Sequence, residues 1–197
     1  TPYPAGTTFT FTNPASFGDG THGGNAYRVT KFKYVWDKNA SHTWTGSETD
    51  WNSGSLPLTP NSGDGSYYLH LQSFNGDNVA TVTTLDDGPF LFDGTAPTVT
   101  VNQAVGQADP TSSLPIYFSV VFSESVSDFA QGDVNFNGTA TGISYNITGN
   151  GTTYQIVVTA VTTPGTVVAS VGSGKAHDQA GNGNTSSTST DNSVLYS

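Results

Sequence analysis

The sequence predicts an all-β fold arranged as two β-sandwiches in tandem, residues 1–93 and 94–197. Two observations carry this prediction. Thr, Ser, Gly and Asn are abundant, and aromatic residues make up 12% of the chain, a composition that suits a pleated surface better than a helix. Short runs of alternating apolar and polar residues also recur at roughly ten-residue spacing between Gly, Asn and Pro turns, which is typical of β-sandwiches.

The first half contains four runs that we expect to be strands, at residues 7–12, 27–36, 66–74 and 89–92. The longest of them places Phe32, Tyr34 and Trp36 on one face, because successive side chains of a strand point to opposite faces. Residues 37–54 are mostly polar and are expected to form a long loop.

The second half contains seven such runs, at residues 98–104, 115–123, 133–138, 143–148, 154–161, 165–171 and 192–196. Two polar stretches, 124–132 and 172–190, are expected to be loops. Seven strands at this spacing predict an immunoglobulin-like (Ig-like) sandwich. The chain contains no Cys, so the disulfide of antibody domains and thiolate metal sites are both excluded.

A short segment, residues 91–99, separates the two halves. It begins where an apolar run ends at Phe92 and contains Asp93, Gly94 and Pro97. Gly permits a sharp backbone path, and Pro cannot donate a hydrogen bond to a strand ladder. We therefore expect a short, stiff joint between two domains, and Asp93 is its most informative residue.

Charge restricts the possible partners. The net charge is −10, with nine acids and four bases in residues 1–93 and six acids and one base in residues 94–197. Such a surface repels phosphate backbones, so nucleic acid is not an expected partner. The chain has no run of eighteen apolar residues, so we expect no membrane insertion. Its first residues also lack the basic and apolar regions of a signal peptide.

Three motifs of the second half occur in a recognisable order: Asp-Gly-Thr-Ala-Pro-Thr-Val at 93–99, Phe-Ser-Glu at 122–124 and Asp-Gln-Ala-Gly-Asn at 178–182. In this order they resemble the bacterial Ig-like repeats of large secreted and surface proteins, including adhesins. Gly94 is a departure, since the linker of those repeats commonly has Thr there. The resemblance implies a secreted or cell-surface location.

The first half resembles, less closely, a fibronectin-III-like or Ig-like repeat of bacterial extracellular proteins. The resemblance rests on Trp36, on the segment between Trp44 and Trp51, and on residues 67–71 and 88–90. It implies a second, non-catalytic sandwich.

Sequence-distant acids are expected to converge at one pole of the second sandwich. In an Ig-like sandwich the N-terminus, the loop after the second strand and the loop before the last strand share a pole, which brings Asp93, Glu124 and Asp178 together. Crowded carboxylates are hard oxygen ligands that suit Ca²⁺, with Asn182 and Asp133 as further candidates. The resemblance points the same way, since related repeats bind Ca²⁺ near their linkers. The alternative is that these acids only cap turns.

A second candidate site is aromatic. Trp44, Trp51 and Tyr67 are candidates for a sugar-stacking platform, because aromatic faces pack on the apolar faces of sugars. The alternative, which we favour, is that these rings fill the core or cover long loops.

Catalysis is not expected. The four His residues (His22, His42, His70 and His177) are scattered and form no metal-binding motif. The chain also has no nucleophile elbow and no phosphate-binding loop.

The interpretation that follows is a non-catalytic segment of a large bacterial extracellular protein, cut from a longer tandem array. We expect a monomeric spacer or adhesion stalk with a Ca²⁺-stiffened joint, whose partners are neighbouring domains of the same chain. The competing hypothesis is a carbohydrate-binding accessory module that binds glycans through the aromatic residues of the first domain.

Overall fold

The computed structural model describes residues 1–4, 6–14, 17 and 28–197, and this part of the chain is all-β, as predicted. It forms two compact units, Thr1–Gly94 and Thr95–Ser197. No helix capable of crossing a membrane occurs among the described residues.

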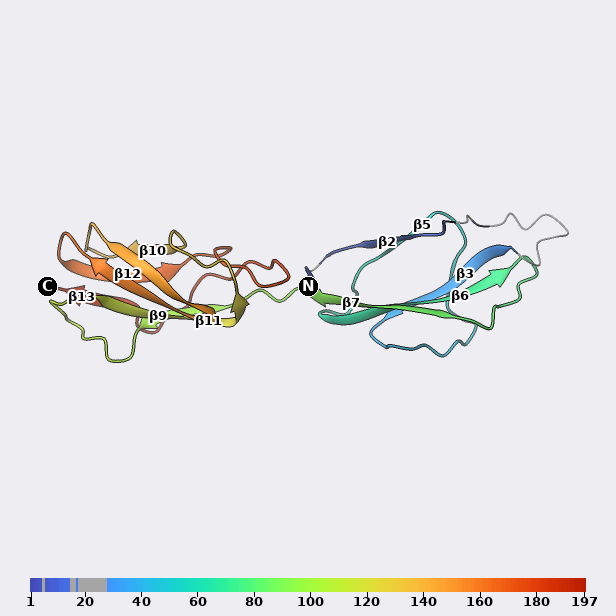
Figure 1. Cartoon of the computed structure of the whole chain (residues 1–197), viewed down its shortest axis with the longest axis horizontal. Coiled ribbons are helices and arrows are strands. Elements are labelled where there is room, and N and C mark those ends of the chain that lie inside the picture. Colours follow the sequence, from blue (N-terminus) through green and yellow to red (C-terminus); the bar gives the residue numbers. More distant parts are fainter. Residues whose placement is uncertain (5, 15–16, 18–27) are drawn as a thin grey trace. The chain divides into compact units, whose positions relative to one another are not determined.

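Unit 1 contains a five-stranded sheet and a separate two-stranded one. The order of the larger sheet is β1-β7-β6-β3-β4, with β1 parallel to β7 and the other neighbours antiparallel. Its strands are β1 (Tyr3–Pro4), β7 (Leu85–Asp93), β6 (Gly65–Asn75), β3 (Val29–Asp37) and β4 (Thr49–Trp51), and the smaller sheet pairs β2 (Phe9–Thr12) with β5 (Ser55–Leu58). Figure 1 shows β2 and β5 as a layer on one side of β3, β6 and β7.

Aromatic rings fill the space between these layers. Phe9 of β2 contacts Phe92 of β7 at a ring-centroid distance of 5.4 Å, and Trp36 of β3 stacks on Tyr67 of β6 at 5.3 Å. The alternation within each strand turns these rings inward. The aromatic content of unit 1 is therefore largely core.

Unit 2 is a sandwich of two three-stranded sheets, β10-β12-β13 and β11-β9-β8. Its strands are β8 (Val99–Gln103), β9 (Ile116–Val126), β10 (Val134–Asn137), β11 (Ser144–Ala160), β12 (Gly165–Val171) and β13 (Ser193–Tyr196). Alternate residues of β9 point inward and are buried with apolar side chains of the other strands. This alternation is the pattern from which the strands were predicted.

Two predicted strands of unit 2, 143–148 and 154–161, fall in the single continuous element β11, which runs from Ser144 to Ala160. A Cβ placed on Gly149 would lie 2.3 Å from the carbonyl oxygen of Thr153, and Thr159 Oγ1 donates a hydrogen bond to the carbonyl of Ser144 at 3.3 Å. The run therefore folds back on itself as a tight hairpin whose close approach only Gly permits.

The outer edge of β8 is paired by a segment of the long loop that precedes β13. The backbone N–H of Val101 donates to Thr188 O at 3.0 Å, that of Thr188 donates to Val99 O at 3.0 Å, and that of Gln103 donates to Asp191 O at 2.7 Å. The stretch 172–190, predicted to be loop throughout, thus supplies hydrogen bonds to a sheet edge.

The sequence prediction of the strands was wrong at three points. It assigned residues 37–54 to a loop, but Thr49–Trp51 form β4, and it missed β5, in which Leu56 and Leu58 are buried around Pro57. It also placed Glu124 in a loop, whereas β9 continues to Val126. Part of the predicted strand 27–36 lies outside the described residues; β3 begins at Val29.

Candidate metal centre

The segment that leads into β8 is fixed to the rest of unit 2 by backbone hydrogen bonds. Thr98 and Ser123 form a reciprocal pair: Ser123 N donates to Thr98 O, and Thr98 N donates to Ser123 Oγ, each at 2.9 Å. The carbonyl of buried Pro97 accepts a hydrogen bond from Thr185 N at 2.8 Å. These bonds hold the segment next to Glu124 and to the loop that precedes β13.

The loop 172–185 carries Asp178, whose side chain is only 7% exposed. Asn182 holds this carboxylate from two directions, because its backbone N–H donates to Oδ1 and its Nδ2 donates to Oδ2, both at 2.9 Å. The turn between them places Gly181 at a φ of 92°, a conformation that favours Gly. The Asp-x-Ala-Gly-Asn motif is thus a turn that orients one acid.

Asn184 secures the same loop and was not singled out from the sequence. It is 2% exposed; its Oδ1 accepts hydrogen bonds from the backbone N–H groups of Lys175 (2.7 Å) and Ala176 (2.8 Å), and its Nδ2 donates to the carbonyl of Gly172 at 2.9 Å. A buried amide so fully paired fixes the backbone around it. Its sequence context, one Asn in a polar loop, does not distinguish it.

A pair of hydrogen bonds between Asp128 and His177 joins this loop to the segment after β9. Asp128 accepts hydrogen bonds from the backbone N–H and from the Nδ1 atom of His177, each at 2.7 Å. Burial raises the pKa of Asp128, but the hydrogen bonds and the charge of His177 outweigh it and leave the pKa below its ordinary value. The pair holds position 177 beside the chain that follows β9.

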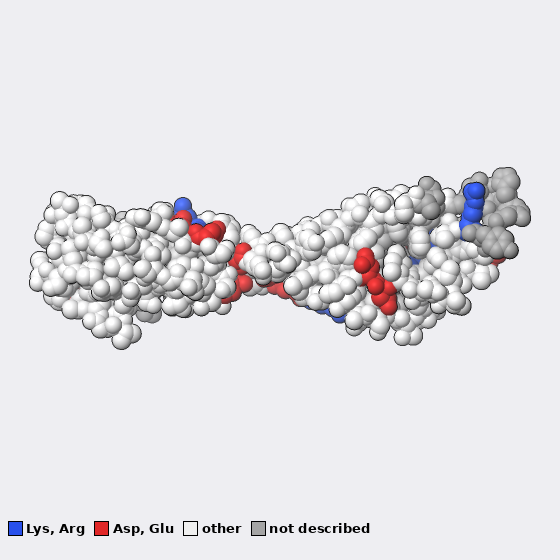
Figure 2. All heavy atoms as spheres, viewed as in Figure 1, with Lys and Arg blue, Asp and Glu red and all other residues white. Residues whose placement is uncertain are grey.

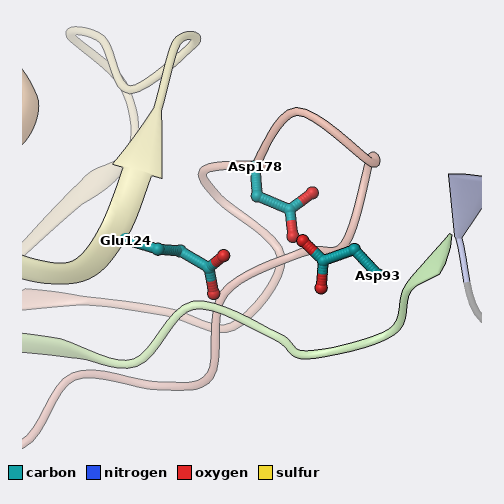
Figure 3. Close-up of side chains that lie close together, drawn as sticks. All are labelled: Asp93, Glu124 and Asp178. Carbon is teal, nitrogen blue, oxygen red and sulfur yellow. The ribbon is translucent and has the colours of Figure 1, made fainter. Parts of the chain in front are cut away.

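Asp93, Glu124 and Asp178 come together as a cluster of three carboxylates. One carboxylate oxygen of each lies within 4.8 Å of those of the other two, and Figure 3 shows the three side chains pointing toward one another. They come from the end of β7, from β9 and from the loop 172–185. Asp93 and Glu124 are half-buried and Asp178 is buried.

The chemistry of this cluster fits a hard divalent cation. Ca²⁺ binds oxygens at about 2.3–2.6 Å, so ligands on opposite sides of the ion lie roughly 5 Å apart. Three carboxylates at such separations repel one another when all are ionised. A bound cation would offset that repulsion, so these three residues could hold one.

The two weaker metal candidates have other contacts. The side chain of Asn182 orients Asp178, as described above. Asp133 Oδ2 accepts a hydrogen bond from Ala130 N at 2.8 Å, and Asp133 is not part of the carboxylate cluster found among the described residues. Asp133 therefore accepts a hydrogen bond within its own turn.

The three rings considered for a sugar-stacking platform lie at different depths in unit 1. Trp51 is 6% exposed and stacks on Phe32 at 5.3 Å, and Tyr67 is 0% exposed and stacks on Trp36. Rings buried in the core cannot stack on a sugar at the surface. Trp44 alone of the three is half-buried, and it lies edge-on to His42 at 4.9 Å.

The comparisons with known proteins concern the family of the chain. No curated protein matches the chain. A family model described as "Bacterial Ig-like domain" matches residues 93–195, a segment that begins at Asp93 and includes Glu124 and Asp178. Domains of this family are generally non-catalytic structural modules and typically occur in extracellular or surface proteins. Since the match covers more than half of the chain, the protein belongs to the bacterial Ig-like domain family.

Proposed function

We propose that this protein is a non-catalytic spacer or stalk segment of a bacterial extracellular protein, and that Asp93, Glu124 and Asp178 bind Ca²⁺ and thereby stiffen the joint. The observation that carries the proposal is the convergence of these three carboxylates from three separate parts of the chain. Spacing within 4.8 Å matches the coordination sphere of Ca²⁺.

The position of the three ligands gives the cation a mechanical effect. Asp93 ends β7, the last strand of unit 1, whereas Glu124 and Asp178 belong to unit 2. One ion coordinated by all three would add non-covalent links across the short joint that runs through Gly94. Without the ion, Gly94 would leave the backbone of the joint more freedom than the Thr of related repeats.

The surface of the protein suits a spacer. Only 10% of residues are charged, and most of the face seen in Figure 2 carries neither sign of charge. A surface of Thr, Ser, Asn and Gly is well hydrated and offers few strong contacts to other macromolecules. This supports a role in holding neighbouring domains apart. It also supports a monomer whose only partners are the neighbouring domains of its own chain.

The proposal is tested by Ca²⁺ titration calorimetry on the full chain, with thermal unfolding in Ca²⁺ and in EDTA. We expect one binding event and a higher melting temperature in Ca²⁺, both lost in Asp93→Ala and Asp178→Ala. Asp133→Ala is the matched control, since it removes an acid outside the cluster and should leave binding intact. Equal melting in Ca²⁺ and EDTA for the unsubstituted protein would end the proposal.

The mechanical part needs its own measurement. Spin labels on one exposed residue of each unit, read by double electron–electron resonance, should give a narrower distance distribution in Ca²⁺ than in EDTA. A distribution that Ca²⁺ does not narrow, in a protein that binds the ion, would leave a cation site without a role in stiffness.

A further inference from the structure

His70 is a fully buried histidine of unit 1. It lies in β6 of the five-stranded sheet, opposite Asp86 of β7 on one side and Val35 of β3 on the other, and its side chain is 0% exposed. A buried polar group is normally hydrogen-bonded, because an unpaired one costs its full desolvation energy. The partners of its two ring nitrogens therefore determine its protonation.

Both ring nitrogens face acceptors. Nδ1 lies 2.5 Å from Asp86 Oδ1, and Nε2 lies 3.1 Å from the backbone carbonyl oxygen of Asn39. Nε2 also lies 3.5 Å from Asp37 Oδ1. A carbonyl cannot donate, and a neutral imidazole carries a proton on only one nitrogen. With Asp86 ionised, both bonds form only if the ring carries two protons.

We propose that His70 is an imidazolium in the folded protein and acts as a pH-sensitive fastener of residues 38–48, the segment between β3 and β4. Its Nε2–H holds the carbonyl of Asn39 at the start of this segment, and its Nδ1–H holds Asp86 of β7. The ring thus joins two strands of the sheet to the segment that follows the third. Loss of one proton leaves one of the two acceptors unsatisfied and removes the cation between two carboxylates.

Two carboxylates and two aromatic rings surround the imidazole of His70. Asp37 approaches it from the end of β3, Asp86 from β7, His42 from the segment 38–48 with ring centroids 5.6 Å apart, and Tyr68 from β6 itself at 6.5 Å. Burial raises the pKa of Asp37, but hydrogen bonds from Asn39 and the positive charge of His70 outweigh it and leave that pKa below its ordinary value. Two carboxylates therefore face one ring.

The same segment is held at its far end by Glu48. Its carboxylate accepts hydrogen bonds from the backbone N–H groups of Thr45 (2.6 Å) and Gly46 (2.9 Å), and His42 Nε2 lies 3.2 Å away. The hydrogen bonds of Glu48 and those of His70 respond to opposite changes of pH. Acid protonates the Glu48 carboxylate, whereas alkali deprotonates the His70 cation. Residues 38–48 should therefore be held at both ends only at intermediate pH.

The first test is two-bond ¹H–¹⁵N NMR on the ¹⁵N-labelled full chain at about pH 7.5, above the ordinary histidine pKa of about 6.5. We expect protons on both ring nitrogens of His70, while His177, exposed and paired with one carboxylate, serves as the internal reference. A neutral ring with a proton on only one nitrogen, whichever nitrogen that is, would overturn the proposal.

The second test measures how firmly His70 holds residues 38–48 to the sheet. Hydrogen-exchange protection of residues 38–48, corrected for intrinsic rates, should fall by at least about tenfold as the pH is raised until His70 is neutral, because a lost charge-assisted bond permits local opening. Asp86→Asn should keep the protection and remove its pH dependence, since the new amide can donate to a neutral ring. His177→Gln, which alters a pair in unit 2, should change neither. Protection that stays constant while His70 titrates would overturn the proposal.

Discussion

The side chain of Asn182 donates from Nδ2 to Asp178 Oδ2 at 2.9 Å, while its backbone N–H donates to the other carboxylate oxygen at the same distance. One residue thus contacts both oxygens of the most buried acid of the cluster. Groups that orient a metal ligand typically contribute about ten- to one-hundred-fold to metal affinity. Asn182 therefore orients the Asp178 carboxylate.

Asn182→Ala should weaken Ca²⁺ binding about tenfold, because Asp178 loses one of the bonds that fix its orientation. Calorimetric titration measures the change, and Asn150→Ala, in the exposed hairpin of β11, is the control. Unchanged affinity in the Asn182 variant would show that the turn backbone alone positions Asp178.

Asn184→Ala should destabilise unit 2 by about 2–4 kcal/mol, since several buried backbone groups lose their partner at once. The measurement can separate the units, because Trp36, Trp44 and Trp51 all belong to unit 1. The urea midpoint should fall in far-UV circular dichroism, while the tryptophan fluorescence transition stays where it was. A loss of stability seen equally by both probes would contradict the assignment of Asn184 to unit 2 alone.

Trp51→Ala should destabilise unit 1 by about 3–5 kcal/mol, the usual cost of truncating a buried Trp. Trp44→Ala, at a half-buried position, should cost less than about 1.5 kcal/mol. Urea unfolding followed by the remaining tryptophans measures both. Comparable costs would mean that Trp44 packs as deeply as Trp51.

Acid should weaken unit 1 through Glu48. Burial raises the pKa of this carboxyl, but hydrogen bonds from Thr45 and His42 outweigh it and lower the pKa from 4.5 to about 2. A group whose pKa is lower in the folded state contributes stability that is complete above pH 4.5 and is lost as the pH falls toward 2. Glu48→Gln should abolish this part of the acid dependence, which fluorescence of Trp44 in the same segment can follow. Identical acid profiles would exclude Glu48 as its source.

The sequence anticipated most of unit 2 because its strands alternate cleanly. The predicted strand at Gly165–Val171 matches β12, since apolar side chains at every second position leave one register that buries them. The convergence of Asp93, Glu124 and Asp178 could also be anticipated, because the order of three motifs locates them at one pole of a known topology. The exact path of the chain at Glu124 could not be anticipated, because β9 continues to Val126, beyond the apolar run from which it was predicted.

Unit 1 was harder to predict because its short strands carry little pattern. β4 has three residues, two of them polar, and β5 has a Pro between its two Leu residues. The burial of Trp51 depends on its pairing with Phe32, a contact between distant segments that local alternation does not encode. Its own sequence neighbourhood is polar, so the sequence alone left a surface role open beside the favoured interpretation that this ring packs in the core or covers a loop.

The hydrogen bonds that Thr188 and Asp191 make to β8 have a consequence for folding. A strand at the margin of a sheet exposes backbone groups that can recruit a strand from another chain or domain. Two sandwiches joined by a few residues experience each other at high effective concentration, which favours exchange of strands between neighbours during folding. By covering β8 with a segment of its own unit, the chain removes one template for such misassembly.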